Sequence, residues 1–570
     1  MGISVFKSRD WFYILPVALV AMVLGLIGFS ICAPAECHTD SFAGAFFRTI
    51  DLIRGSGHYV LGRDPWQLVA AQLLMPVAFA VTAVKLVIAN MRRDLKVMAI
   101  RRMRGHAIVC GTGDTGRHIA ERLADSGQSV VVIALDTQSP NALACERRGI
   151  PVLQGNAQET NLLRMAGLLR ASRLFVACGS DAANIEIGLR ALAASAKRKV
   201  ADPIVIMPEM RSEWLYDQVQ THRAALQATD FAHFRIFNLN ANAARSLLQS
   251  EGFHRAAERA GEAPHLMVIG QGQTLYEVTA QAALCNFAVP GRRLAVSLVG
   301  ENTALSLDAV ARRYPGLKDH VALKTYENAL GDPPAWALLA QLLSANPPFA
   351  IVIDLQAEER TIEAAVRLRK LLDAEGLFAV PVYPRIWQQH QLGAFLQRME
   401  ATEQEAGRLA FFGDLAFLAS PDQLLQQSLD LMAVATHRVH RESEPQANAP
   451  DWPQLAEMYK QSNRMFADHI PVKLSGIGFE MAPAGVDATL SENDIERLAE
   501  AEHWRWCVEK KLAGWRHDPA RDDMRKHHPL LLDWEALPEG AREDNRRMVR
   551  RIPSIVRAAG YSIRRAGKPA

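Results

Sequence analysis

The feature that most constrains this chain is a glycine-rich turn, GTGDTG (Gly111–Gly116), which follows two long apolar runs and a basic stretch. The runs Trp11–Ala33 and Trp66–Val84 contain no charged residue. About 20 apolar residues suffice for a helix to cross a bilayer. A signal peptide is the alternative for the first run, but that run is long and a second one follows it. We therefore expect a membrane domain over residues 1–104, with transmembrane helices at 11–33 and 66–90.

Basic residues lie on one side of both runs. Lys7 and Arg9 precede the first run, and six cations follow the second: Arg92, Arg93, Lys96, Arg101, Arg102 and Arg104. The positive-inside rule then predicts a protein of the cell inner (cytoplasmic) membrane, with both termini and the soluble domains in the cytoplasm. The segment 34–65 faces the outer side.

Two interpretations fit that outer segment. Ser41–Ile53 is typical of a short amphipathic helix and Gly55–Gly62 of a glycine-rich turn, the order found in the re-entrant segment of a two-span channel. A loop on the outer membrane surface fits equally well. A TVGYG potassium filter is absent, and the charges of Arg48, Asp51 and Arg54 are unsuited to a selective cation pore. Whether the segment conducts ions stays open.

The glycine turn has the surroundings of a dinucleotide-binding fold. Ala107–Cys110 predicts a strand before it, Arg117–Ala124 a helix after it, and Val130–Leu135 a second strand that ends at Asp136. In such folds the first glycine makes the turn, the second admits a pyrophosphate, the third lets helix and strand pack, and the acid binds the ribose. The free N–H groups of the helix start attract phosphate. A turn kept for packing alone is the alternative.

Strands continue to alternate with helices as far as about residue 240, which predicts a parallel sheet in a domain over 105–250. The segment resembles the N-terminal domain (TrkA-N type) of the regulator-of-potassium-conductance family. The resemblance rests on four stretches: HAIVCGTGDTG, VVIALD, the GNA stretch together with the leucine and alanine that follow it, and SDAANI. The resemblance implies binding of NAD(H) or another adenine nucleotide, and gating of a pore by a change of shape. The family commonly has Asp where Asn156 stands. The candidate cofactor-binding residues are Gly111, Gly113, Asp114, Gly116, Arg117, Asp136 and Asn156.

A second, degenerate copy of this pattern occupies residues 262–440. His265–Val278 again predicts strand, glycine turn and helix, but Leu275 stands where a third glycine would be. Further strands are predicted near 293–301, 348–354 and 380–387, so the order of elements indicates a divergent internal repeat. We expect Leu275 to crowd the helix against the strand or the phosphate, and the domain to serve structure or to take an altered ligand.

The C-terminal part, 450–565, has a different character. PQANAP (Pro445–Pro450) is a plausible linker, Ser491–Glu496 resembles a capping box, and Leu498–Trp515 has a strong helical pattern. LAE-x-x-H-x-x-W, EKKLAGW, HPLL and W-x-x-LP followed by DNRR resemble the ryanodine-receptor repeat (RyR) domain. The resemblance implies a small, mainly helical module for ligand sensing or interaction.

Tryptophans stand among arginines in this domain, and such pairs can stack a base and clamp a phosphate. The alternative is that the tryptophans fill the domain core. Trp506 fits that alternative, because it shares a helix face with Ile495, Leu498 and Ala499. The candidate ligand-binding residues are Glu502, Trp504, Arg505, Trp515, Arg516 and His528.

Composition narrows the function classes. The net charge of +3 gives no argument for nucleic acid, and the seven cysteines form no CxxC pair or zinc pattern, so no metal site is expected. Cys32 and Cys37 flank the outer end of the first run, where a disulfide is an open option. No catalytic constellation accompanies the glycine turn, so we expect no enzyme; a nicotinamide-dependent enzyme is the third hypothesis.

The leading hypothesis is a nucleotide-sensing, ligand-gated, channel-like membrane protein for potassium or other cations. Two spans cannot enclose a pore alone, so a homo-oligomer is implied, with a tetramer favoured. The alternative is a non-selective or non-conducting membrane effector switched by a nucleotide second messenger. Both hypotheses name a small nucleotide-like ligand.

Overall fold

The computed structural model describes residues 11–32, 41–55, 59–61, 63–199, 202–212, 215, 231–250, 253, 256, 264–285, 294–328, 333–388, 409–424, 430–443, 450–452, 455, 457–483 and 485–566. The chain forms two compact units, Met1–Met103 and Arg104–Ala570.

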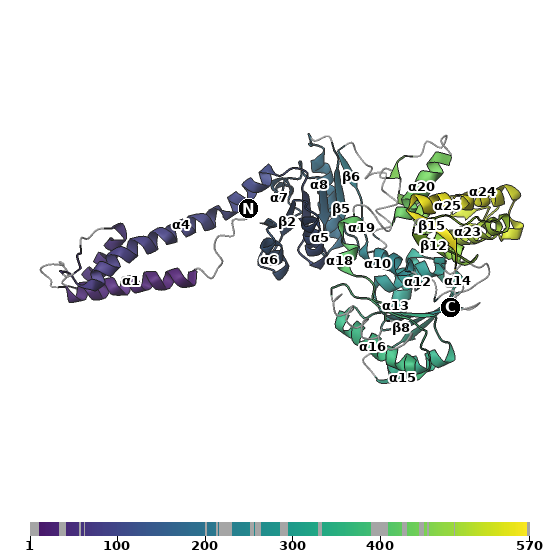
Figure 1. Cartoon of the computed structure of the whole chain (residues 1–570), viewed down its shortest axis with the longest axis horizontal. Helices are drawn as coiled ribbons and strands as arrows, with labels where there is room; N and C mark the ends of the chain where they lie inside the picture. The colour runs from purple at the N-terminus through teal and green to yellow at the C-terminus, as the bar shows by residue number, and fades with distance from the viewer. Residues whose placement is uncertain are drawn as a thin grey trace. The chain divides into compact units, whose positions relative to one another are not determined.

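The first unit is helical. Its elements are α1 (Trp11–Ile31), α3 (Phe42–Asp51), a 3-10 turn η2 (Leu52–Arg54) and α4 (Trp66–Arg102), with α1 and α4 side by side (Figure 1). Within the described residues, one helical stretch, Trp66–Val84 of α4, is long and apolar enough to cross a membrane by length and composition. In α1 the stretch that passes as apolar is shorter, Leu19–Ile31. One of the two predicted spans is thus supported by this measure.

Small residues let the helices of this unit approach closely. A Cβ added at Gly28 of α1 would lie 2.7 Å from the Leu68 side chain of α4, and one at Gly25 would lie 2.5 Å from Thr49 of α3. Small residues serve the same purpose in membrane helix pairs. Gly25 lies about 9 Å along the helix axis from Ile31, the last residue of α1, because each residue adds 1.5 Å. Since Thr49 of α3 packs at Gly25, α3 lies along the side of α1 and not beyond its end. Cys32 is disulfide-bonded, and Cys37 lies outside the described residues.

The second unit begins with a parallel sheet of six strands in the order β3-β2-β1-β4-β5-β6. The strands are β1 (Ala107–Cys110), β2 (Val130–Ala134), β3 (Val152–Gln154), β4 (Arg173–Val176), β5 (Ile204–Pro208) and β6 (Ala232–Phe234). The connecting helices are α5 (Asp114–Asp125), α6 (Pro140–Arg147), α7 (Thr160–Met165) and α8 (Asp181–Ser195). β1 and β2 are buried along their whole length, as expected of parallel strands covered by helices on both faces. The strand order reverses between β1 and β4, next to the glycine turn.

A second parallel sheet follows, in the order β11-β10-β7-β8-β9. Its strands are β7 (His265–Gly270), β8 (Leu294–Gly300), β9 (Val321–Glu327), β10 (Ala350–Asp354) and β11 (Val382–Pro384). Its helices are α12 (Gln273–Cys285), α13 (Thr303–Arg313), α14 (Leu317–His320), α15 (Pro333–Ala345), α16 (Glu358–Ala374), α18 (Leu415–Leu418) and α19 (Pro421–Leu424). Helix α10 (Leu239–Leu248) packs on α12, and one apolar cluster includes residues from both sheets. The predicted tandem of parallel sheets is confirmed.

The C-terminal elements surround a further apolar cluster, to which most of them contribute residues. They are α20 (Leu431–Ser443), α21 (Glu457–Asp468), α22 (Ile470–Ser475), β12 (Phe479–Pro483), α23 (Glu492–Leu512), β13 (Arg516–His517), β14 (His527–His528), η8 (Trp534–Ala536), α24 (Glu539–Arg550), α25 (Ile552–Ala558) and β15 (Tyr561–Arg565). β12 and β15 form an antiparallel pair. The predicted capping box is confirmed: Ser491 and Asp494 cap α23 reciprocally.

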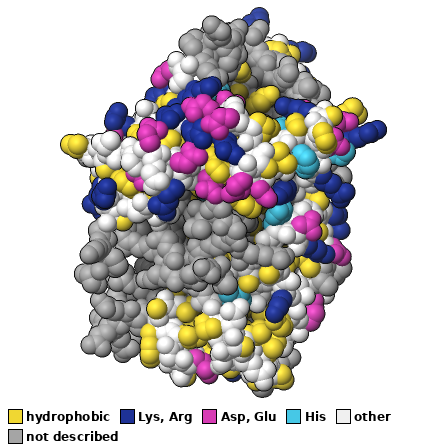
Figure 2. All heavy atoms as spheres, turned by 90° about the vertical axis from the view of Figure 1, so that its right-hand side faces the viewer, with side chains coloured by type: hydrophobic (Ala, Val, Ile, Leu, Met, Phe, Trp, Pro, Cys, Tyr) yellow, Lys and Arg dark blue, Asp and Glu magenta, His cyan; other side chains and the backbone are white. Residues whose placement is uncertain are grey.

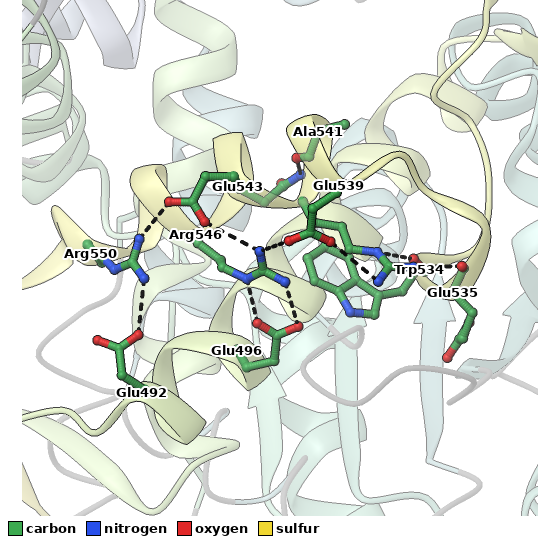
Figure 3. A network of polar contacts seen from close by, with 11 residues as sticks. Glu492, Glu496, Trp534, Glu535, Glu539, Ala541, Glu543, Arg546 and Arg550 are labelled. Atoms are coloured by element: carbon green, nitrogen blue, oxygen red, sulfur yellow. Dashed lines mark hydrogen bonds and ion pairs between the residues drawn. The ribbon is translucent and has the colours of Figure 1, made fainter.

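A ladder of ion pairs joins α23 to α24 (Figure 3). Arg546 binds Glu496 of α23 at 2.6 Å and Glu539 at 2.6 Å, and Arg550 binds Glu492 at 3.0 Å and Glu543 at 2.8 Å. Acidic and basic side chains accordingly interleave on the face shown in Figure 2. Ion pairs near the surface contribute about 1 kcal/mol or less each, so the ladder adds little to the apolar contacts between the two helices.

Candidate functional site

The first glycine turn is open where a phosphate would lie. Gly111 has φ +100°, and a Cβ there would lie 2.2 Å from the Ala177 carbonyl oxygen after β4; a Cβ at Gly116 would lie 2.2 Å from the Gly111 oxygen. Packing therefore requires both glycines. Gly113 has φ −63°, and a Cβ there would meet nothing within 4 Å. Neither the backbone conformation nor packing calls for glycine at that position, and the space beside its Cα is free of described protein atoms.

The start of α5 is also free of a side-chain cap. Gly113 is its N-cap residue and has no side chain to accept a hydrogen bond. By contrast, Ser139 accepts from Ala142 N at the start of α6, and Ser180 accepts from Ala183 N at the start of α8. The first N–H groups of a helix need a partner. Of these three helices, α5 is the one without a side-chain cap; the short helix α7 lacks one as well.

The other sequence candidates lie after successive strands of this sheet. Asp136 follows β2, is exposed, and accepts a hydrogen bond from Gln138 N at 2.8 Å. Asp114, at the first turn of α5, accepts from Asn141 Nδ2 at 3.2 Å, which links α5 to α6. Asn156 follows β3 and accepts from Gln158 N at 3.0 Å. The carboxyl ends of parallel strands meet at one edge, so these residues share the edge of the glycine turn. Arg117 instead approaches Glu121 of its own helix, at 3.9 Å.

Sequence reasoning missed a buried acid at this edge. Glu209 follows β5 and is 2% exposed, and it pairs with Arg211 at 3.3 Å and with the Thr115 hydroxyl in the first turn of α5. Burial raises the pKa of the Glu209 carboxyl, and the charge of Arg211 opposes that rise. Asn184 of α8 donates to the Glu209 carbonyl at 2.9 Å. The signal was the same as for Asp136: an acid directly after an apolar strand.

A glutamine side chain covers the second glycine turn. A Cβ at Gly270 would lie 1.9 Å from the Asp354 carbonyl oxygen, and one at Gly272 would lie 2.0 Å from Gln356 Nε2. Gln356 has φ +60° and donates through Nε2 to the Gln271 carbonyl at 2.8 Å. The place over this turn is therefore filled by the chain itself.

The crowding expected from Leu275 stays a prediction, and the side chain that lies over this turn is that of Gln356. Leu275 is 1% exposed and lies in the apolar cluster that includes residues of both sheets. The edge beside the turn is instead closed by polar contacts. Asp354 binds Arg385 at 2.8 Å, and Arg385 donates to Asn240 of α10 at 3.0 Å.

The six candidate ligand-binding residues of the C-terminal domain differ in burial and in contacts. Glu502 and Arg505 are buried in an internal network, in which Glu502 binds Lys473 at 2.5 Å and Arg505 at 2.8 Å. Burial lowers the pKa of Lys473 to about 8. These charges pair with one another inside the domain. Trp504 is half-buried on α23.

Trp515 and His528 do come together. Their ring centroids lie 6.1 Å apart, and His528 also meets Trp506 edge to face at 4.9 Å. Trp506 is half-buried, whereas Ile495, Leu498 and Ala499 of its predicted face lie in the core. Arg516 is exposed on β13.

Known proteins resemble separate parts of this chain. The model of the TrkA-N domain matches residues 107–212, and that of the RyR domain matches residues 488–565. An uncharacterized protein of Methanothermus fervidus is 33% identical over 92 residues, which is 16% of this chain and 14% of that protein. The chain thus spans a small part of that relative.

Among solved structures, the GsuK channel aligns with a TM-score of 0.39 at 15% identity, over 74% of this chain and 97% of that one. The GsuK channel bound to NAD aligns with a TM-score of 0.37 at 13% identity, over 74% of this chain and 83% of that one. The segment similar to the TrkA-N domain contains the first glycine turn, and the segment similar to the RyR domain lies at the C-terminal end; the second glycine turn lies outside both matched ranges.

Proposed function

We propose that this protein is a nucleotide-sensing, channel-like membrane protein, in which a ligand at the first glycine turn regulates the passage of potassium or other cations. The observation that carries the proposal is the open position at Gly113 beside the uncapped start of α5. It lies in the segment matched by the TrkA-N domain. The role of the turn is sensing, and we assign it no catalytic residue.

NAD(H) or another adenine nucleotide is the ligand that this edge suits. The free N–H groups of α5 would bind the pyrophosphate. Asp136 would accept hydrogen bonds from ribose hydroxyls, and its bond from Gln138 N orients the carboxylate. Bound nucleotide can shift the membrane part only if it binds one of two states more tightly.

The membrane unit supports an anchored protein. Large apolar side chains are exposed on α1 and α4: Val17, Leu19, Val20, Val23, Ile27, Ile31, Leu73, Val77, Phe79, Val81 and Val84. Lipid is the solvent that suits such faces. Two spans cannot enclose a pore alone, so the proposal includes a homo-oligomer, with a tetramer favoured, in the inner membrane and with its soluble domains in the cytoplasm.

A second candidate function is a non-selective or non-conducting effector switched by a nucleotide second messenger. The observation that favours it is charge in the outer segment: Arg48, Asp51 and Arg54 are exposed on α3 and η2. Charged side chains at membrane depth are costly unless they face water or partners.

The test has two stages. Calorimetry of the detergent-solubilised protein with NAD, NADH, ATP and ADP should show saturable binding of at least one nucleotide, and binding of none would overturn the sensor. The protein is then reconstituted in vesicles loaded with potassium and a fluorescent dye. Nucleotide-dependent potassium release without dye release supports the channel, and release of both supports a non-selective effector. Release of neither contradicts both of these and leaves the non-conducting form of the effector.

A further inference from the structure

A buried cluster of charges joins α10 to the C-terminal elements. The guanidinium of Arg245 on α10 binds Asp468 of α21 at 2.8 and 3.1 Å, and it binds Asp430, just before α20, at 2.8 Å. Arg464 of α21 binds the same Asp430 carboxylate at 2.8 Å, and Gln249 donates to Asp468 at 2.7 Å. Arg245 is 7% exposed and Asp430 3%. Two positive and two negative charges thus meet away from solvent.

Such a cluster is a costly way to join two elements. Buried charges lose their hydration, and well-packed apolar residues in the same place are often as stable. Burial raises the pKa of Asp430, but the charges of Arg464 and Arg245 outweigh burial and lower it, so the carboxylate stays ionised. The planar fork of Arg245 reaches both carboxylates in one orientation. The pairs therefore hold α10 and α21 in one relative position, and a shift of either helix breaks them together.

The start of α10 is linked to the first glycine turn by consecutive contacts. The Thr115 hydroxyl, in the first turn of α5, binds the Glu209 carboxylate after β5. The next residue, Met210, donates its N–H to the Phe237 carbonyl at 2.9 Å. Asn238 follows and caps α10 with its side chain. A contiguous path therefore leads from the turn to the first residue of α10.

Helix α10 also has an apolar side. Ala243, Ala244, Leu247 and Leu248 lie in the cluster that includes residues of both sheets. Arg245 is two helical turns, about 10 Å, from the cap of α10. One short helix thus contacts the first domain at its start, the apolar core along one side and the C-terminal elements through its arginine.

We propose that α10 couples the first glycine turn to the C-terminal domain, and that the Arg245 cluster is the joint through which the coupling acts. Nucleotide at the turn shifts α10 through Thr115 and Glu209, and the shift changes how α20 and α21 pack on α10. This inference rests on the proposed function, because it takes the first turn as the nucleotide site. Coupling between two sites is reciprocal, so a change in the packing of α21 alters nucleotide affinity by the same factor.

The test is hydrogen–deuterium exchange of the full-length protein in detergent, with NAD, NADH, ATP and ADP added separately. A nucleotide that slows exchange within 107–136 should also change the exchange rates of α21 by about fivefold or more, the lower end of usual coupling between two sites. Arg245→Gln should keep the effect within 107–136 and lose the effect in α21. Asp468→Asn leaves the pair of Arg245 with Asp430, so it is the milder variant should the first not fold, and it should weaken the effect in α21.

Two controls separate the coupling from other causes. Arg369→Gln removes an equally buried arginine whose bonds, to Asp373 and to the Val380 carbonyl, stay among the elements of the second sheet. This variant should keep the effect in α21. Gly113→Asp blocks the first turn and should abolish both effects, which shows that the change in α21 starts from that turn.

The outcomes distinguish the coupling from the proposed function. Slower exchange within 107–136 without any effect in α21 overturns the coupling and leaves the proposed function standing. The coupling is also overturned by an effect in α21 that survives both Arg245→Gln and Asp468→Asn, that is lost in Arg369→Gln, or that persists in Gly113→Asp. No slowing within 107–136 with any of the nucleotides contradicts the proposed function itself, and the coupling with it.

Discussion

The two glycine turns of this chain occupy equivalent positions in their sheets. The first turn is open, whereas the side chain of Gln356 covers the second. In each, the first glycine packs on a backbone carbonyl at the end of the neighbouring strand: that of Ala177, just after β4, for Gly111, and that of Asp354, the last residue of β10, for Gly270. Two residues later, each neighbouring strand continues into a residue of positive φ: Gly179 (φ +80°) in the first domain and Gln356 (φ +60°) in the second. The two positions are equivalent, and only the second carries a side chain.

That difference indicates which residue controls the access of a phosphate to a glycine turn. The missing third glycine drew attention to Leu275, yet Leu275 is in the core and Gln356 covers the turn. A Cβ at Gly179 would meet nothing within 4 Å. We infer that the residue after the neighbouring strand, more than the glycine pattern itself, decides whether phosphate can reach the turn.

The largest effect is expected from Gly113→Asp. A carboxylate there would face the phosphate, and like charges about 4 Å apart repel by roughly 4 kcal/mol at an effective dielectric of 20. Nucleotide affinity should fall by about 100-fold or more in calorimetry. Aspartate is a favoured N-cap residue, so the melting temperature should hold or rise. Gly113→Ala adds a methyl group without charge, so it should fold and lose less affinity than Gly113→Asp; equal loss in both variants would contradict the electrostatic account.

Gly179→Gln should cover the first turn as Gln356 covers the second. We expect about a tenfold loss of nucleotide affinity, together with a cost of about 1 kcal/mol for a side chain at positive φ. Gly127→Gln is the matched control, because Gly127 has φ +81° and open space around its Cβ position but lies after α5, away from the turn. If both variants bind like the unmodified protein, the role of the covering residue is refuted.

Gln356→Gly should uncover the second turn. It removes the bond from Nε2 to the Gln271 carbonyl but relieves the strain of a side chain at φ +60°, so stability should change by less than about 1 kcal/mol. Gln356→Ala keeps the strain and loses the bond, and it should melt at a lower temperature. A weak second binding event in calorimetry with Gln356→Gly supports the comparison. An unchanged stoichiometry would show that Asp354 and Arg385 also close this edge.

The smallest effect is expected from Glu209→Gln at the first edge. An acid whose pKa is raised by folding binds more protons when folded, so its contribution to stability is present below its unfolded pKa and is lost as the pH rises through the folded pKa. In Glu209→Gln the free energy of unfolding should therefore vary less with pH across this range. At neutral pH it should change by less than about 1 kcal/mol. Urea unfolding between pH 4 and 8 measures both. A steeper curve in the variant would mean that the Arg211 charge outweighs burial.

Much of the fold could be predicted from local patterns. Continuous apolar runs such as Val130–Ala134 predict buried parallel strands, and Ser491 with Asp494 marks the start of α23. The side-chain environment of the candidate site residues was less accessible. Glu502 and Arg505 stand beside Trp504 in the sequence, yet their charges are neutralised by Lys473 and Glu509 inside the domain.

The sequence by itself determined the two parallel sheets, the first glycine turn and the capped C-terminal helix, because periodicity, glycine spacing and caps act over a few residues. Only the tertiary structure decided that Gly179 leaves the first turn open, that Gln356 covers the second, and that His528 lies between Trp506 and Trp515. Those contacts join residues that are far apart in the chain. Strand order and helix packing bring them together, and no local pattern encodes which side chain reaches the turn.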